Sequence, residues 1–434
     1  MFTIRTKPVL SVLLVAALSL SVLLLIPAAG AQDGDSTRTG FRPDAPPYGV
    51  RGPYPVGFMT FSIEVAGRPL EGAIWYPAVN PDGAEEVITY DIGVGDLVPP
   101  LAAMPGRALQ DAAPDTANGP YPLVVYSHGA NGQLYFTAYL REHLASHGFV
   151  VIAVLHSDTL RSNLSATTDS EQAAVMQTFI DSMVLRPLDI TRTLDYAETL
   201  AAPDGSMAGV IDMDHVAVLG LSYGGATAVL AGGAHLDFRS LPELCAPDVY
   251  ASGLTSTICG MYGADLPGLE AHLMELAGLD GEPGQLWPSL GDPRIDAIVS
   301  LMPGGSTVHV SEEGYANLTL PMLLFRAGND EMAIPEYNVN RVWQYSGSPS
   351  KTLVTLENAG HMVGGQCSPT VAAMPVFFPS CSDPVWDVDR VHDLIDHFVT
   401  AFLLAELNGD EDAAAALAPD TVQFPGISYE TTEF

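Results

Sequence analysis

Short apolar runs recur along this chain, between longer segments in which apolar residues return every three or four positions. Such runs are typical of strands buried on both faces, and the second pattern is typical of helices that pack on a sheet. We therefore predict an α/β fold with a mostly parallel central sheet flanked by helices. The predicted strands are residues 58–65 and 70–76, as an opening antiparallel pair, and then 123–126, 149–155, 216–219, 297–301, 322–325 and 352–356. The predicted helices include residues 135–146, 171–200, 269–277 and 386–404, and one that starts near residue 226.

One folded domain is expected over residues 58–434. Residues 32–57 are rich in Pro, Gly, Asp and Arg, which predicts an irregular N-terminal arm. Residues 236–293 interrupt the alternation, and such an insertion is either a cap over a pocket or a surface decoration. The acidic stretch after Glu406 is expected to pack loosely.

The N-terminus has the pattern of a secretory signal peptide. Arg5 and Lys7 precede an apolar run from Val9 to Ile26, and small residues lead up to Ala31. The run is long enough to stay as an anchor, but the small residues before polar Gln32 favour cleavage. We therefore expect residues 1–31 to be removed and the mature protein to be secreted or periplasmic.

The chain is strongly acidic, with a formal net charge of −34. Removal of the signal peptide takes away two basic residues, Arg5 and Lys7, and no acidic ones. A surface of this charge repels nucleic acid and anionic membranes, so neither is expected as a partner. We expect a monomer without stable membrane association after signal cleavage.

The four cysteines fall into two pairs, Cys245 with Cys259 and Cys367 with Cys381. In an exported chain they suggest two local disulfides, although four cysteines permit three pairings. Zinc sites usually have shorter Cys-x-x-Cys spacings, so no metal is expected.

Ser222 occupies the centre of Gly220-Leu221-Ser222-Tyr223-Gly224, directly after the apolar run 216–219. A strand that stops abruptly, a serine in a strained turn and a helix that starts at once make up a nucleophile elbow. The alternative is an ordinary turn of small residues after a strand. We favour a nucleophile because its partners follow in the expected order.

A serine nucleophile needs a histidine to take its proton and a carboxylate to orient that histidine. Asp330 follows the predicted strand 322–325, and His361 follows the strand 352–356. The order serine, aspartate, histidine is that of one large group of α/β hydrolases. Glu331 competes with Asp330, but the aspartate comes first after the strand.

The oxyanion of the tetrahedral intermediate requires two amide donors. We predict the backbone N–H groups of Tyr223, at the start of the helix, and of Ala130, with Gly129 as the neighbouring alternative. Gly129 and Asn131 are also expected to contact substrate. His128 is expected to support this turn and not to act as the base.

Several segments resemble the bacterial dienelactone-hydrolase-like proteins related to platelet-activating-factor acetylhydrolase. These segments are residues 68–70, 74–78, 122–129, 144–151 and 186–189. The resemblance implies an α/β-hydrolase fold and ester cleavage without a metal. The acetylhydrolases proper take their acid after the preceding strand, where this chain has residues 301–305 and no carboxylate.

The block 144–151, the Asn329-Asp330 turn and a disulfide near the histidine loop are also similar to bacterial cutinase-like polyester hydrolases. In those enzymes the position of Ala130 is often aromatic and clamps a polymer ring. This alanine weakens the similarity, although Tyr135, Tyr223 or Tyr262 could supply an aromatic surface.

The sequence thus predicts an exported serine carboxylic-ester hydrolase that uses no cofactor and acts on a small-molecule or polymeric ester. A polyester hydrolase is the alternative. A catalytically silent binding protein on the same fold is the alternative of another class, and the intact serine, acid and base argue against it.

Overall fold

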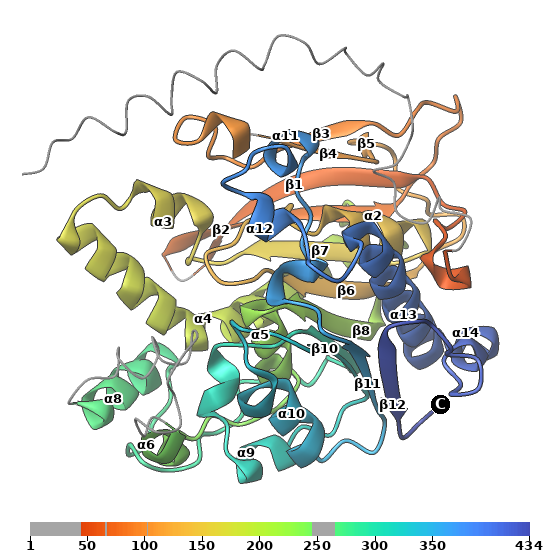
Figure 1. Ribbon diagram of the computed structural model, residues 1–434. Coiled ribbons are helices and arrows are strands. Elements are labelled where there is room, and N and C mark those ends of the chain that lie inside the picture. Colours follow the sequence, from red (N-terminus) through yellow and green to blue (C-terminus); the bar gives the residue numbers. More distant parts are fainter. Residues whose placement is uncertain (1–44, 66, 102, 245–264) are drawn as a thin grey trace, which may run out of the picture.

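The structure is a computed structural model that describes residues 45–65, 67–101, 103–244 and 265–434 (Figure 1). Within these residues the centre is a ten-stranded sheet of order β12-β11-β10-β9-β8-β6-β7-β2-β1-β5. The six central strands, β7, β6, β8, β9, β10 and β11, pair in parallel. β12 pairs antiparallel with β11 at one end, and β2 pairs antiparallel with β7 and with β1 at the other. The predicted α/β fold with a mostly parallel sheet is therefore confirmed.

The strands of this sheet are β1 (Val56–Val65), β2 (Arg68–Pro77), β5 (Leu109–Gln110), β6 (Tyr121–Ser127), β7 (Val150–Leu155), β8 (Ile211–Leu221), β9 (Ala297–Leu301), β10 (Met322–Ala327), β11 (Lys351–Leu356) and β12 (Ile427–Thr431). All eight predicted strands are present, with ends that differ by a few residues. A separate pair, β3 (Ile88–Asp91) and β4 (Ala103–Gly106), was not predicted because its strands are short and carry little apolar pattern.

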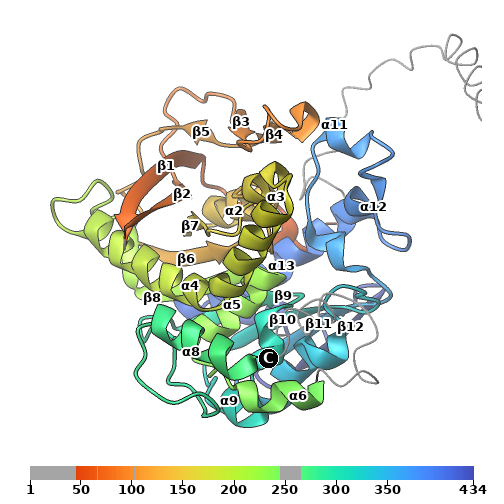
Figure 2. The ribbon, with the colours of Figure 1, turned by 90° about the vertical axis from the view of Figure 1, so that its left-hand side faces the viewer.

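Helices cover both faces of the sheet (Figures 1 and 2). Side chains of β6 and β8 alternate between two hydrophobic clusters, one with α4, α5, α8 and α10 and the other with α2 and α13. Because both faces are covered, the parallel strands are mainly apolar. The helices are α2 (Ala138–Ser146), α3 (Leu160–Ser165), α4 (Asp169–Ala201), α5 (Tyr223–Ala231), α6 (Leu241–Leu244), α8 (Leu266–Leu276), α9 (Glu312–Ala316), α10 (Val339–Tyr345), α11 (Pro369–Ala372), α12 (Phe378–Cys381), α13 (Val388–Asn408) and α14 (Glu411–Ala416).

The C-terminal tail is ordered, and the prediction that it packs loosely is wrong. α14 follows α13, and β12 adds an antiparallel edge strand to β11. Tyr429 of β12 stacks on Phe398 of α13 with ring centroids 5.7 Å apart, and its hydroxyl donates to the carbonyl of Leu417 at 2.6 Å. The apolar residues spaced among the acidic ones therefore bury against the sheet and α13.

Several predictions about the chain ends and the insertion fall partly or wholly on residues 1–44 and 245–264. The signal peptide, half of the N-terminal arm, Cys245 and Cys259 lie outside the described residues. The described end of the arm contacts α13, where the Tyr48 N–H donates to His397 Nδ1 at 3.3 Å. No helix in the described part of the chain is long and apolar enough to cross a membrane.

Deleting residues 425–434 should lower thermal stability, because it removes β12 and unpairs the edge of β11. Loss of one largely buried aromatic side chain alone is worth about 2 kcal/mol of unfolding free energy. We expect a lower melting temperature by circular dichroism. Glu430→Ala, which keeps the strand and removes an exposed side chain, should melt like the parent. Equal melting of the deleted and full-length proteins would show that the tail contributes no stability.

Candidate active site

Ser222 lies in the turn between β8 and α5 in a strained conformation, with φ of 57° and ψ of −117°. A non-glycine residue at positive φ is uncommon and persists only where the surroundings impose it. Here the Ser222 N–H donates to the carbonyl of Leu301 at 2.8 Å, and its own carbonyl accepts from Gly304 and Ala226. Backbone hydrogen bonds to α5 and to the end of β9 therefore hold Ser222 in this conformation.

Two glycines make this turn sterically feasible. A Cβ atom at Gly224 would lie 1.9 Å from the carbonyl oxygen of Ser127, and one at Gly220 would lie 2.0 Å from that of Gly224. No side chain fits at such distances. The motif therefore places the first turn of α5 directly against the end of β6, as the elbow prediction requires.

Asp330 and His361 come from the ends of two neighbouring parallel strands, β10 and β11. Parallel strands present their carboxyl ends at one edge of the sheet, and this brings both residues to Ser222. His361 Nε2 lies 2.8 Å from Ser222 Oγ, and His361 Nδ1 lies 2.6 Å from Asp330 Oδ2. The second oxygen of Asp330 accepts the N–H groups of Met332 and Ala333 at 2.9 and 2.6 Å.

This arrangement can transfer a proton. With Nδ1–H donating to the Asp330 carboxylate, Nε2 of His361 carries a lone pair directed at the Ser222 hydroxyl. His361 and Asp330 are both buried, whereas Ser222 is partly exposed to the cavity. Glu331, the alternative acid, is exposed, and the hydrogen bond to Nδ1 comes from its neighbour.

Both ring nitrogens of His128 are hydrogen-bonded to groups other than the Ser222 hydroxyl. Its Nδ1–H donates to the Gly129 carbonyl at 2.7 Å, and its Nε2 accepts the N–H of His156 at 3.1 Å. Burial and the nearby Arg186 cation hold the pKa of His128 well below its usual value. This ring is therefore neutral and braces the loop after β6.

A second chain of the same residue types lies behind this loop. Ser127 Oγ is 2.8 Å from His156 Nε2, and His156 Nδ1 is 3.0 Å from Asp189 Oδ2. Asp189 also pairs with Arg68 and Arg192. The side chains of His156 and Asp189 are 0% exposed and residue Ser127 is 0% exposed, so no substrate can reach this serine. Accessibility singles out Ser222 as the candidate nucleophile.

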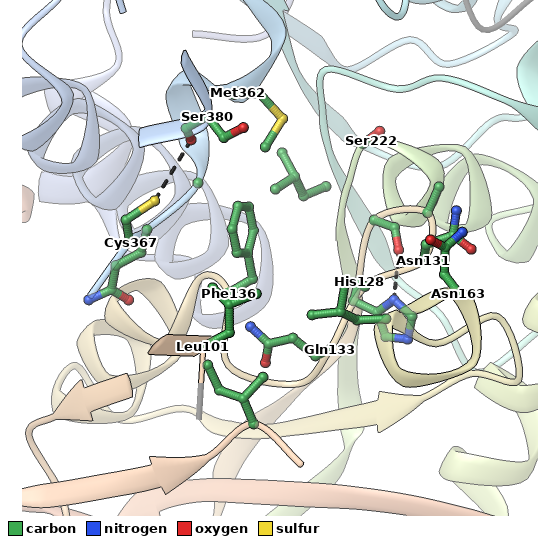
Figure 3. A pocket seen from close by; sticks show the side chains of 18 of the residues that line it. Leu101, His128, Asn131, Gln133, Phe136, Asn163, Ser222, Met362, Cys367 and Ser380 are labelled. Carbon is green, nitrogen blue, oxygen red and sulfur yellow. Dashed lines mark hydrogen bonds between the residues drawn. The ribbon is translucent and has the colours of Figure 1, made fainter. Parts of the chain in front are cut away.

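A cavity of about 520 Å³ opens beside Ser222 and His361, and most of its lining is apolar. Ala130, Gly129 and Asn131, predicted near the oxyanion and substrate, all line it. Figure 3 shows Phe136 between the side of the cavity that carries Ser222 and the side that carries Cys367. Tyr223, the other predicted amide donor, is buried at the first position of α5.

Besides the loop after β6 and the residues around Ser222 and His361, three segments line this cavity: the β3–β4 region, α3 with the start of α4, and the chain that carries α11 and α12. Figure 2 shows where these segments lie in the fold. Sequence reasoning did not assign these walls. No described residue of the insertion 236–293 lines the cavity. Of the two alternatives, a cap or a surface decoration, the cap is thus left only to residues 245–264, which lie outside the described part.

The predicted Cys367–Cys381 disulfide is present in the structure, with Cα atoms 5.6 Å apart. Both cysteines line the cavity. The segment between His361 and Cys367 has other anchors, because Gly364 accepts from Tyr139 at 3.2 Å and Gly365 accepts from His392 at 2.9 Å. The disulfide therefore mainly closes the cavity wall formed by α11 and α12.

No cluster of three or more His, Cys, Asp or Glu side chains suited to a metal ion occurs among the described residues. The groups gathered at the cavity are a hydroxyl, an imidazole and a carboxylate, the set that performs nucleophilic acyl transfer.

A family model described as "Platelet-activating factor acetylhydrolase, isoform II" matches residues 58–185, a part that ends before Ser222. A solved structure of a ferulic acid esterase from Streptomyces cinnamoneus superposes with a TM-score of 0.56 at 18% identity, over 91% of this chain and 99% of that chain. The chain has the α/β-hydrolase fold. In this fold the nucleophile lies on the turn after a central strand, which is the position of Ser222 here.

Replacing Cys367 and Cys381 together by serine should destabilise this protein and loosen its cavity wall. A loop of this size contributes about 3 kcal/mol in the chain-entropy model. We expect a lower melting temperature and a higher KM for apolar esters, with a smaller change in kcat because His361 has other anchors. A loss of kcat at unchanged KM would instead show that the disulfide holds the histidine.

Proposed function

We propose that this chain is an exported serine carboxylic-ester hydrolase that forms an acyl-enzyme on Ser222. The observation that carries the proposal is the hydrogen-bonded series from Ser222 through His361 to Asp330, of which Ser222 and His361 line an apolar cavity. The comparisons support the coarser class of ester hydrolase. Export rests on the predicted signal peptide.

In the proposed mechanism, His361 Nε2 takes the Ser222 proton as Oγ attacks the ester carbonyl. The resulting imidazolium keeps its Nδ1–H on Asp330, which stabilises the positive charge. The oxyanion accepts the N–H groups of Ala130 and Tyr223. His361 then gives the proton to the departing alcohol. A water molecule, deprotonated by the same ring, releases the acid and restores Ser222.

Ser222→Ala should lower kcat by roughly 10⁴-fold or more, because the hydroxyl forms the covalent bond. Ser127→Ala is the matched control, since it removes the serine of the buried Ser127-His156-Asp189 chain. At equal folded fraction, a fluorophosphonate probe should label the parent and Ser127→Ala but not Ser222→Ala. Labelling of Ser222→Ala at the parental rate would contradict the assignment of the nucleophile.

The walls of the cavity favour an ester that carries an apolar group. Four methionines line it, Met104, Met176, Met332 and Met362, and Val175 and Phe179 add apolar surface from α4. Methionine side chains adapt to ligands of different shapes, so the walls favour a range of apolar groups over one rigid ligand.

The rim of the cavity gives the polyester alternative one specific support. Met176 and Met332 line the cavity and are still 38% and 41% exposed. Val376 and Phe378, which flank the lining residue Phe377, are 73% and 61% exposed. Apolar surface continuous with the cavity suits an insoluble ester.

Activity should rise with the length of the apolar chain on the substrate. Each CH₂ group buried in the cavity is worth about 0.8 kcal/mol, or roughly fourfold in kcat/KM, until the cavity is full. We would measure p-nitrophenyl esters of increasing acyl length and acetate esters of increasing alcohol length. One of the two series should show the rise, and Val175→Ser should flatten it.

Val87→Ser, which changes an exposed valine that does not line this cavity, should leave the slope unchanged. A flat or falling profile in both series would contradict the proposed apolar substrate. It would leave the serine mechanism untouched.

A further inference from the structure

Arg186 lies in the middle of α4 and is completely buried behind the loop that follows β6. It forms a two-pronged ion pair with Asp158, from Nε to Oδ1 at 2.9 Å and from Nη2 to Oδ2 at 2.7 Å. Asp158 is 2% exposed. A buried ion pair of this kind contributes little net stability unless further hydrogen bonds satisfy its remaining polar groups. The other N–H groups of the guanidinium therefore need acceptors.

Those donors bind the carbonyl groups of the predicted oxyanion loop. Nη1 of Arg186 donates to the His128 carbonyl at 2.5 Å, and Nη2 donates to the Gly129 carbonyl at 3.0 Å. Asp158 Oδ2 accepts the N–H of Asn131 at 3.2 Å, and Asn131 has a φ of 48°. One buried ion pair therefore holds three successive peptide groups of this loop.

These contacts determine which way the amide donors point. In a planar trans peptide, the C=O group and the N–H group of the next residue point in opposite directions. Because the Gly129 carbonyl is drawn to Arg186, the N–H of Ala130 is directed away from the guanidinium. Ala130 lines the cavity with Ser222, and a Cβ atom at Gly129 would lie 3.6 Å from the Ser222 Cβ.

The same guanidinium also packs on the residue that supplies the other predicted donor. Its Cζ lies 4.4 Å from the centre of the Tyr223 ring. Tyr223 is held from α4 as well, because its hydroxyl accepts from Ser182 at 3.2 Å and donates to the Phe179 carbonyl at 3.3 Å. Arg186 thus touches both sides of the predicted oxyanion hole.

We propose that Arg186, oriented by Asp158, is the positioning residue of the oxyanion hole. This inference rests on the proposed ester hydrolysis. Arg186 touches neither substrate nor Ser222 and acts through the peptide groups that it fixes. A lysine cannot replace it, because one ammonium group cannot hold a two-pronged carboxylate pair, two carbonyl groups and an aromatic face in a single geometry.

The test compares Arg186→Lys, Arg186→Met and Asp158→Asn with the parent. We would measure kcat, KM and the inhibition constant of butylboronic acid. Boron accepts Ser222 Oγ, the proton passes to His361, and the tetrahedral adduct places a boron-bound oxygen in the oxyanion hole. We expect Arg186→Lys and Arg186→Met to lose roughly 10²-fold in kcat, with little change in KM.

The inhibition constant of the boronic acid should rise by the same factor by which kcat/KM falls. A merely structural role would lower the folded fraction without this parallel change. Asp158→Asn keeps the shape of the side chain and removes one acceptor, so it should show the same pattern at a smaller size. It decides the question if both arginine variants fail to fold.

Arg294→Met is the control, because Arg294 pairs with Asp195 and Glu198 of the same helix far from the loop. It should leave all three constants unchanged. The proposal is overturned if folded Arg186 or Asp158 variants keep parental kcat, or if kcat falls while boronic acid affinity stays the same. The proposed function fails separately, through full activity of Ser222→Ala.

Discussion

The close contact between the first turn of α5 and the end of β6 is the constraint on which the rest of the site depends. A Cβ at Gly224 would fall 1.9 Å from the Ser127 carbonyl, so only glycine permits this contact. It places the strained Ser222 beside the loop that begins at His128. Ser222 and the loop with the predicted amide donor therefore lie on either side of the contact between α5 and β6.

Buried polar groups hold the loop after β6 in one geometry. His128, His156, Arg186 and two carboxylates, Asp158 and Asp189, form a connected network behind the loop, with hydrogen bonds of 2.5–3.1 Å. Burial lowers the pKa of both histidines, so the rings stay neutral and their tautomers are determined by their partners. Such networks specify one arrangement when each member is satisfied.

Much of the sheet could be predicted from the sequence, because strands covered on both faces contain short runs of apolar residues. Ser222, Asp330 and His361 were found from their places after such strands, and the structure brings them within hydrogen-bond distance. The edge strand β12 was not predicted, because only alternate residues of it are partly buried and the strand has no continuous apolar run. Arg186 was missed as a positioning residue because its role depends on contacts with residues 28 to 58 positions away.

The cavity walls show the same limit. They come from three segments that are distant in the sequence, and none has a pattern that points to a binding site. An insertion between strands is easier to recognise in a sequence, and for that reason a cap was considered at residues 236–293. Local sequence patterns predict helices, strands and the residues at their ends. The walls of the cavity depend instead on how segments distant in the sequence come together in the fold.

The central claim is covalent catalysis on Ser222, and the most direct measurement is to trap the acyl group. The purified mature protein would be mixed with p-nitrophenyl trimethylacetate, whose bulky acyl group leaves the enzyme slowly, quenched in acid and digested for mass spectrometry. We predict a burst of about one p-nitrophenol per active site and the trimethylacetyl group on the peptide that carries Ser222. Steady hydrolysis with the acyl group on another residue, or on none, would contradict the account.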